Sequence, residues 1–79
     1  MSIVDRVAKV FSDVFAIDAG LVTIDTVPDD VEKWDSMGHM NMVGELEKEF
    51  GVQFDLDEIM GMESVQLIGE TLKNKGVSD

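Results

Sequence analysis

The chain has 79 residues, with 17 acidic and 6 basic side chains and therefore a formal charge of −11. This length fits one domain over residues 1–79, which buries only about 60% of the surface that its unfolded chain exposes. The charge argues against a nucleic-acid partner, because phosphate binding requires clustered basic side chains. The absence of cysteine excludes a disulfide scaffold, and no apolar run is long enough to span a membrane.

The acidic excess is confined to residues 18–63, whereas residues 1–17 and 64–79 are each balanced in charge. An acidic surface keeps a small domain soluble, but it also steers basic protein partners toward the molecule. The N-terminus lacks the apolar block and cleavage site of a signal peptide, so we expect a cytoplasmic protein. We also expect it to be a monomer.

The first predicted helix begins at Ser2, where Asp5 completes a capping-box pattern, and it ends at Ala19-Gly20. Apolar residues recur along it at helical spacing and form a stripe of about four turns. The stripe consists of Ile3, Val7, Val10, Val14 and Ile17. Residues 18–35 show no helical period, and a loop of this length is often functional. Its scattered apolar residues predict that it packs across the helices.

A second helix is predicted from Asp35-Ser36 to about Phe50, with Gly51 as its C-terminal cap. Its inward face is expected to contain Val43, Leu46 and Phe50, with Glu47 on or beside it. The only histidine, His39, lies beside this face, and we expect it to pack at the edge of the bundle.

A short helical turn is predicted from Leu56 to Met62, opened by Asp57. Ser64 is expected to cap a last helix that ends at Gly76, after which the tail frays. The inward residues of that helix are Val65, Ile68 and Leu72. The sequence therefore predicts an all-α fold. It is a small antiparallel bundle of three main helices and one short helix, with a long loop between the first two.

The chain carries no recognisable catalytic or metal-binding motif of its own. A standard EF-hand is excluded, because no glycine has the acidic residues around it at the required spacing. Ser36, His39 and Asp35 could supply a catalytic triad by type, but neighbours at a helix start point in different directions. A chain of this size also leaves little room for a substrate pocket. We therefore expect neither a metal site nor catalytic residues.

The order of motifs along the chain points to a specific family. Asp35-Ser36-Met37 matches an Asp-Ser-Leu/Met motif, and Leu46 to Val52 matches its Leu-Glu-x-Glu-Phe-Gly continuation. Over essentially its whole length the chain resembles the acyl carrier protein family. The length, the acidity, the long first loop and the short third helix agree with that resemblance. It implies that Ser36 carries covalent 4′-phosphopantetheine, attached from coenzyme A by a separate phosphopantetheinyl transferase that uses magnesium.

The resemblance also implies a carrier and not an enzyme. The thiol of the arm would hold acyl intermediates as thioesters between enzymes of a fatty acid, polyketide or related biosynthetic pathway. Helix N-termini stabilise phosphate, which suits the position of Ser36. The partners would be acyl-loading, condensing or acyl-transfer enzymes that have basic docking patches.

The docking surface of the family lies on the second helix and on the loop before it. By position, the matching apolar contacts are Met37 and Met40, and the acidic contacts are Glu45, Glu47 and Glu49. Methionine suits a surface that fits several partners. The alternative interpretation is that the methionines fill the edge of the core and that the glutamates form a solvated helix face.

Several positions depart from the common fatty-acid carrier. Gly38 and Asn41 replace acidic residues, and Gly44 replaces a large apolar residue. These changes indicate a specialised carrier. The Asp-Ser-Met-Gly string also resembles D-alanyl carrier proteins, so an aminoacyl cargo is an alternative, and an acidic helical adaptor without covalent cargo is a second one. Trp34 either pins the loop to the bundle or contacts the arm or a partner.

Overall fold

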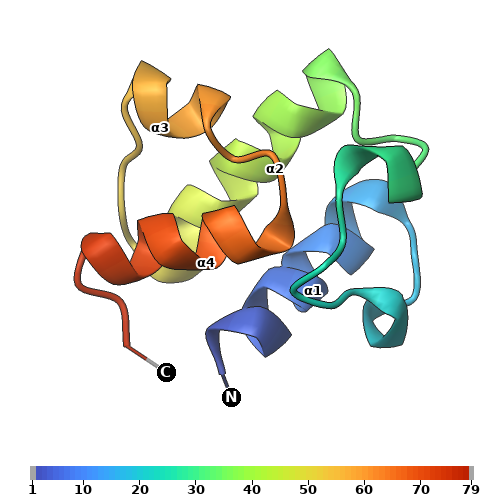
Figure 1. Ribbon diagram of the computed structural model, residues 1–79, viewed down its shortest axis with the longest axis horizontal. Helices are drawn as coiled ribbons and strands as arrows, with labels where there is room; N and C mark the ends of the chain where they lie inside the picture. Colours follow the sequence, from blue (N-terminus) through green and yellow to red (C-terminus); the bar gives the residue numbers. More distant parts are fainter. Residues whose placement is uncertain (1, 79) are drawn as a thin grey trace.

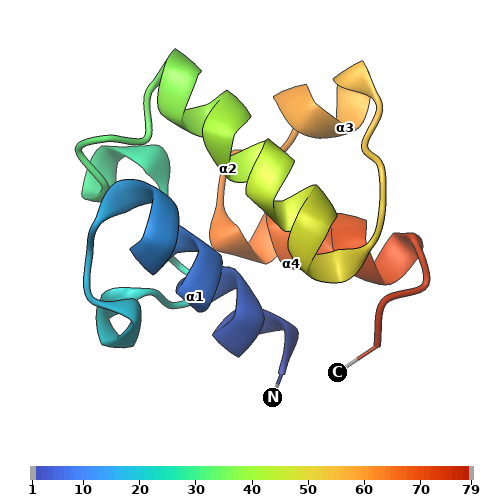
Figure 2. The ribbon, with the colours of Figure 1, turned by 180° about the vertical axis from the view of Figure 1, so that it is seen from behind.

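A computed structural model describes residues 2–78, whose regular secondary structure is helical, with no β-strand in this range. The four α-helices are α1 (Ile3–Phe15), α2 (Ser36–Phe50), α3 (Leu56–Met60) and α4 (Val65–Asn74). Two 3₁₀ turns, η1 (Ala19–Leu21) and η2 (Pro28–Asp30), lie in the loop between α1 and α2. The predicted fold class is confirmed. Helices α1 and α2 lie side by side in opposite directions, and α4 crosses them obliquely (Figures 1 and 2).

Helix α1 begins as the sequence predicts but ends earlier. The Ser2 hydroxyl accepts a hydrogen bond from the Asp5 N–H at 3.1 Å, and the Asp5 carboxylate accepts one from the Ser2 N–H. At the other end Ala16 takes a left-handed conformation with φ of 57°, and its N–H donates to the Ser12 carbonyl. The predicted end at Ala19-Gly20 is therefore wrong. The apolar stripe misled the prediction, because Ile17 still packs on the core after the helix has ended.

The loop between α1 and α2 packs across the helices, as predicted. Val22, Val31 and Trp34 are buried in it. Its backbone also bonds to the start of α4, since the Thr26 carbonyl accepts from the Val65 N–H at 2.9 Å. The loop is therefore an integral wall of the domain.

Helix α2 has the predicted bounds. The Asp35 carboxylate caps it by accepting from the Gly38 N–H at 2.8 Å, and Gly51 ends it with φ of 66°. Its buried residues are Met42, Val43 and Leu46. Met42 is fully buried although the sequence reading did not assign it to the inward face.

Helix α3 begins at Leu56, as predicted, but it ends at Met60 and not at Met62, and its N-cap is not the predicted residue. Asp55, not Asp57, is the N-cap, because its carboxylate accepts from the Glu58 N–H and the Glu58 carboxylate accepts from the Asp55 N–H. Helix α4 has the predicted cap, since the Ser64 hydroxyl accepts from the Leu67 N–H. The predicted inward residues of α4, which are Val65, Ile68 and Leu72, are all buried.

The C-terminal segment is more ordered than predicted. Helix α4 ends at Asn74, and the Val77 N–H then donates to the Leu72 carbonyl at 3.1 Å. Val77 packs on the core, so the prediction of a frayed tail is wrong as far as this residue. Within residues 2–78, no helix is long and apolar enough to cross a bilayer.

Candidate functional site

Ser36 lies at the point where the long loop enters α2. It is the first residue of the helix, and its side chain is exposed. The cap from Asp35 is directed to the Gly38 N–H and leaves the hydroxyl of Ser36 facing solvent. The first amides of α2 carry partial positive charge and point toward this end of the helix. The position therefore suits a phosphate ester on the serine.

Gly38 allows the loop to approach α2 closely. A Cβ atom at position 38 would overlap the Lys33 carbonyl oxygen and would lie 3.0 Å from Cε1 of Phe15. At Gly44, in the same helix, an added Cβ would have no atom within 4 Å apart from its chain neighbours and the backbone of its own helix. The departure of Gly38 from the common carrier pattern thus has a structural cause.

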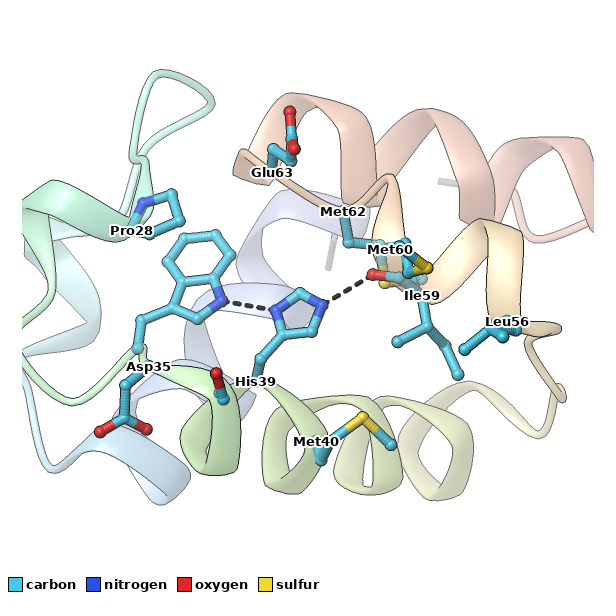
Figure 3. Close-up of a pocket in the computed structure, with 11 residues that line it drawn as sticks. Pro28, Asp35, His39, Met40, Leu56, Ile59, Met60, Met62 and Glu63 are labelled. Atoms are coloured by element: carbon cyan, nitrogen blue, oxygen red, sulfur yellow. Dashed lines mark hydrogen bonds between the residues drawn. The ribbon is translucent and has the colours of Figure 1, made fainter.

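An open groove extends from Ser36 between α2 and α3 (Figure 3). Its volume is about 520 Å³. The prediction of little room for a pocket is wrong, because α3 stands away from α2 and leaves apolar side chains facing the gap. The groove is lined mainly by Trp34, His39, Met40, Leu56, Ile59, Met60 and Met62.

A chain of two hydrogen bonds crosses this groove through His39 (Figure 3). The Trp34 indole N–H donates to Nδ1 of His39 at 2.8 Å, and Nε2 of His39 lies 2.7 Å from the Ile59 carbonyl oxygen. A neutral imidazole with its proton on Nε2 satisfies both contacts. The predicted packing role of His39 is confirmed. Trp34 pins the loop, because its ring packs on Phe11 and Phe15, and it also lines the groove.

Ile59 of α3 packs on the core, but no residue of this helix is fully buried, and polar contacts also hold it in place. Besides the bond from His39 to Ile59, the Lys75 ammonium lies 2.8 Å from Oε1 of Glu58. The hydrogen bond from Lys75, the bond from the Asp55 N–H and the charge of Lys75 together hold the pKa of Glu58 below its ordinary value of 4.5. The outer wall of the groove therefore depends on an ion pair.

We expect Glu58→Gln to lower the melting temperature at neutral pH but not in strong acid. Because the pKa of Glu58 is lower in the folded chain than in the unfolded chain, its contribution is complete above about 4.5. It is lost as the pH falls through the folded-state pKa. The melting temperatures of wild type and variant, measured as a function of pH, should therefore converge below the folded-state pKa of Glu58. Glu70→Gln, on the exposed side of α4, is the control. A constant difference at all pH values would contradict this role of Glu58.

The five predicted docking residues have different surroundings. Met37 is 79% exposed and Met40 is 54% exposed, so both face solvent near Ser36. The Glu45 side chain is about half exposed and lies 3.5 Å from the Lys48 ammonium. Neither methionine is part of the core, which removes the alternative that they fill its edge.

Glu47 and Glu49 are engaged within the molecule. The Glu47 carboxylate accepts from the Phe54 N–H at 2.9 Å and so holds the segment that leads to α3. Arg6 binds Glu49 twice, at Oε2 and at the backbone carbonyl, and thereby joins α1 to α2. The structure thus does not bring the three glutamates together as one free row, and their role in docking stays a prediction.

No group of three or more histidine, cysteine or acidic side chains is placed to bind a metal ion within the described part of the chain. The histidine that could have served as a ligand or base has both ring nitrogens engaged.

The geometry is that of a small helical domain with an exposed serine at a helix start and an apolar groove beside it. The chain matches the family described as phosphopantetheine attachment site over residues 5–72. It therefore belongs to that family, which confirms the resemblance to acyl carrier proteins. The domain is a site of covalent 4′-phosphopantetheine attachment and acts as a carrier. No curated protein gives a significant match to the chain.

Proposed function

We propose that Ser36 is the attachment residue and that the protein carries acyl groups between partner enzymes. The observation that supports this most directly is the exposed hydroxyl at the first residue of α2, next to the groove. The family match includes this residue. When bound, the arm supplies the thiol that this cysteine-free chain lacks, and the thiol holds the cargo as a thioester.

The chain's own residues position the serine but do not activate it. Asp35 caps the helix through the Gly38 N–H, and His39 is bonded to Trp34 and Ile59. His39, with both ring nitrogens engaged, is not free to take the proton of the Ser36 hydroxyl, and we assign that catalysis to a phosphopantetheinyl transferase. The protein is thus a substrate and shuttle, not an enzyme.

The groove favours acyl over aminoacyl cargo. Its lining is mostly apolar, and a hydrocarbon chain buries more apolar surface against the methionine, leucine and isoleucine side chains than a D-alanyl group does. A fatty acyl, polyketide or related intermediate fits this surface better than a D-alanyl group. An adaptor without cargo would not need the groove beside Ser36.

The test is covalent loading of the wild-type protein. Incubation with coenzyme A, magnesium and a broad-specificity transferase is expected to add one phosphopantetheinyl group, detected by intact mass. An unmodified protein after treatment with several competent transferases would contradict the proposal. Mass spectrometry of the protein from its native host would then report the cargo and so distinguish acyl from aminoacyl carriers.

We further propose that partners dock on Met37, Met40 and Glu45. The two methionines are exposed beside Ser36, and Glu45 is the predicted acidic contact with the most exposed side chain. The intramolecular contacts of Glu47 and Glu49 favour a structural contribution from those two residues.

Glu45→Lys is expected to slow association with the transferase and to reduce the salt dependence of that rate. A charge at the rim of an interface acts mainly on encounter, so the effect should shrink at high ionic strength. Stopped-flow association over a salt series measures it, and Glu70→Lys on α4 is the matched control. Equal rates for both variants would contradict a docking face at Glu45.

A further inference from the structure

The groove beside Ser36 has an exposed rim and a closed floor. Met40, Leu56 and Met60 form the rim and are each more than half exposed. Trp34 and Met62 are 5% and 0% exposed and form the floor. His39 and Ile59, which are half-buried, complete the floor and join it to both helices.

The closed core lies directly behind this floor. The Trp34 ring lies 5.0 Å from the ring of Phe11 and 6.1 Å from that of Phe15, between centroids, and both phenylalanines are buried. His39 lies edge to edge with Trp34, with centroids 6.2 Å and ring planes 8° apart, and the indole N–H bond joins the two rings. A chain that entered the core from the groove would have to separate these rings.

Separation of the floor would leave polar groups without partners. The Trp34 N–H and the two ring nitrogens of His39 would lose their hydrogen bonds, whereas the Ile59 carbonyl also accepts from the Met62 N–H at 3.4 Å. A hydrocarbon chain offers no donor or acceptor to replace these bonds, and an unsatisfied buried group is unfavourable. The hydrogen bonds therefore oppose deeper entry in a way that apolar side chains alone would not.

We propose that His39 is a specificity-determining residue that limits the length of cargo the protein protects. By bonding to Trp34 and Ile59, His39 keeps the floor of the groove closed. A short, uncharged acyl chain therefore lies in the groove, whereas the end of a longer chain projects into solvent. The charged residues that line the groove, Asp35 and Glu63, are both acidic and disfavour a cargo with a free carboxylate. This inference rests on the proposed attachment at Ser36 and narrows the cargo that it carries.

The test loads the protein with acetyl, butyryl, hexanoyl, octanoyl and decanoyl groups from the corresponding acyl-coenzyme A. Trp34 is the only tryptophan, so its emission reports contact with the floor. The second readout is the melting temperature, which a fully buried methylene would raise by up to about 3–6 °C in a domain of this size. In wild type, the Trp34 emission and the melting temperature are expected to change as the acyl chain lengthens through the shorter members of the series. Both are then expected to stay constant for the longer members. Succinyl cargo, with the backbone length of butyryl, should give neither change.

Variants at position 39 separate a hydrogen-bonding role from a general effect on stability. His39→Met fills the site but lacks both hydrogen bonds, and its melting temperature should continue to rise through decanoyl. His39→Gln retains an acceptor and a donor and should restore the limit. Each acylated form is compared with its own unacylated form, which removes differences in basal stability, and Leu67→Ala on α4 is the control for a remote change.

Three outcomes would overturn the inference. They are a wild-type response that rises through decanoyl as steeply as that of His39→Met, a wild-type protein that responds to no chain, and a succinyl response equal to that of butyryl. Failure to gain mass from any acyl-coenzyme A would instead contradict the attachment at Ser36. The two proposals can therefore fail separately.

Discussion

Ser36→Ala is expected to abolish phosphopantetheinylation completely and to leave the fold intact. The hydroxyl is the proposed acceptor, and alanine offers no oxygen for the phosphoester bond. The side chain of Ser36 is exposed, and the helix is capped by Asp35. Intact mass after treatment with coenzyme A, magnesium and transferase measures the loss. The melting temperature of the unmodified variant should equal that of unmodified wild type within about 2–4 °C, as for surface substitutions away from special contacts.

The neighbouring serine at a helix start provides the matched control. Ser64 caps α4 as an N-cap residue, and Ser64→Ala should lower stability by about 1 kcal/mol without affecting the added mass. Residual mass addition to Ser36→Ala would show a second acceptor and would contradict the assignment. Loss of modification in both variants would indicate an effect of stability on the transferase reaction.

Gly38→Ala is expected to destabilise the protein by about 1–3 kcal/mol, the range of overpacked sites. Alanine normally favours a helix over glycine by about 1 kcal/mol, so the sign here depends on the steric conflict. The added methyl group would overlap the Lys33 carbonyl oxygen, which is backbone and cannot rotate away. The loop and the first turn of α2 must therefore separate, and Ser36 moves with them. Denaturant unfolding measures the stability, and transferase kinetics should show a lower kcat/KM.

Gly44→Ala is the control in the same helix. Because no atom outside the local helix backbone and the chain neighbours lies within 4 Å of a Cβ at that position, alanine should raise the free energy of unfolding by about 1 kcal/mol. For a domain of this size the melting temperature then rises by about 4–8 °C. Stabilisation by both substitutions would contradict the close approach at Gly38, whereas opposite signs would support it.

Local signals explain how much of the fold could be predicted. The Ser2 and Ser64 caps and the glycine cap at Gly51 depend on residues within one turn, and each was predicted in place. Two local predictions failed, and each failure has a physical reason. Asp55 and Asp57 both suit an N-cap, and only Asp55 has its reciprocal partner in Glu58. The apolar stripe of α1 continues through Ile17, because packing on the core does not require helix.

The part of the candidate site that forms a sequence motif could be predicted, whereas its groove and its surface could not. Ser36, Asp35 and Met37 follow from their order in the chain. The groove could not be predicted, since it depends on the distance of α3 from α2, which the bonds to His39 and Lys75 maintain. The helical pattern placed Glu47 on or beside the inward face of α2, but its bond to the Phe54 N–H and the bond of Glu49 to Arg6 depend on how the segments pack together.

The sequence by itself determined the charge of −11, the absence of a thiol, the helical class and the serine motif with its family. These properties follow from composition and from interactions within one or two turns. Only the tertiary structure decided which acidic side chains remain at the surface, why position 38 is glycine and how the groove is closed by His39. The physical reason is that each of these features depends on contacts between segments that the fold brings together, such as the loop with α2 and α2 with α3.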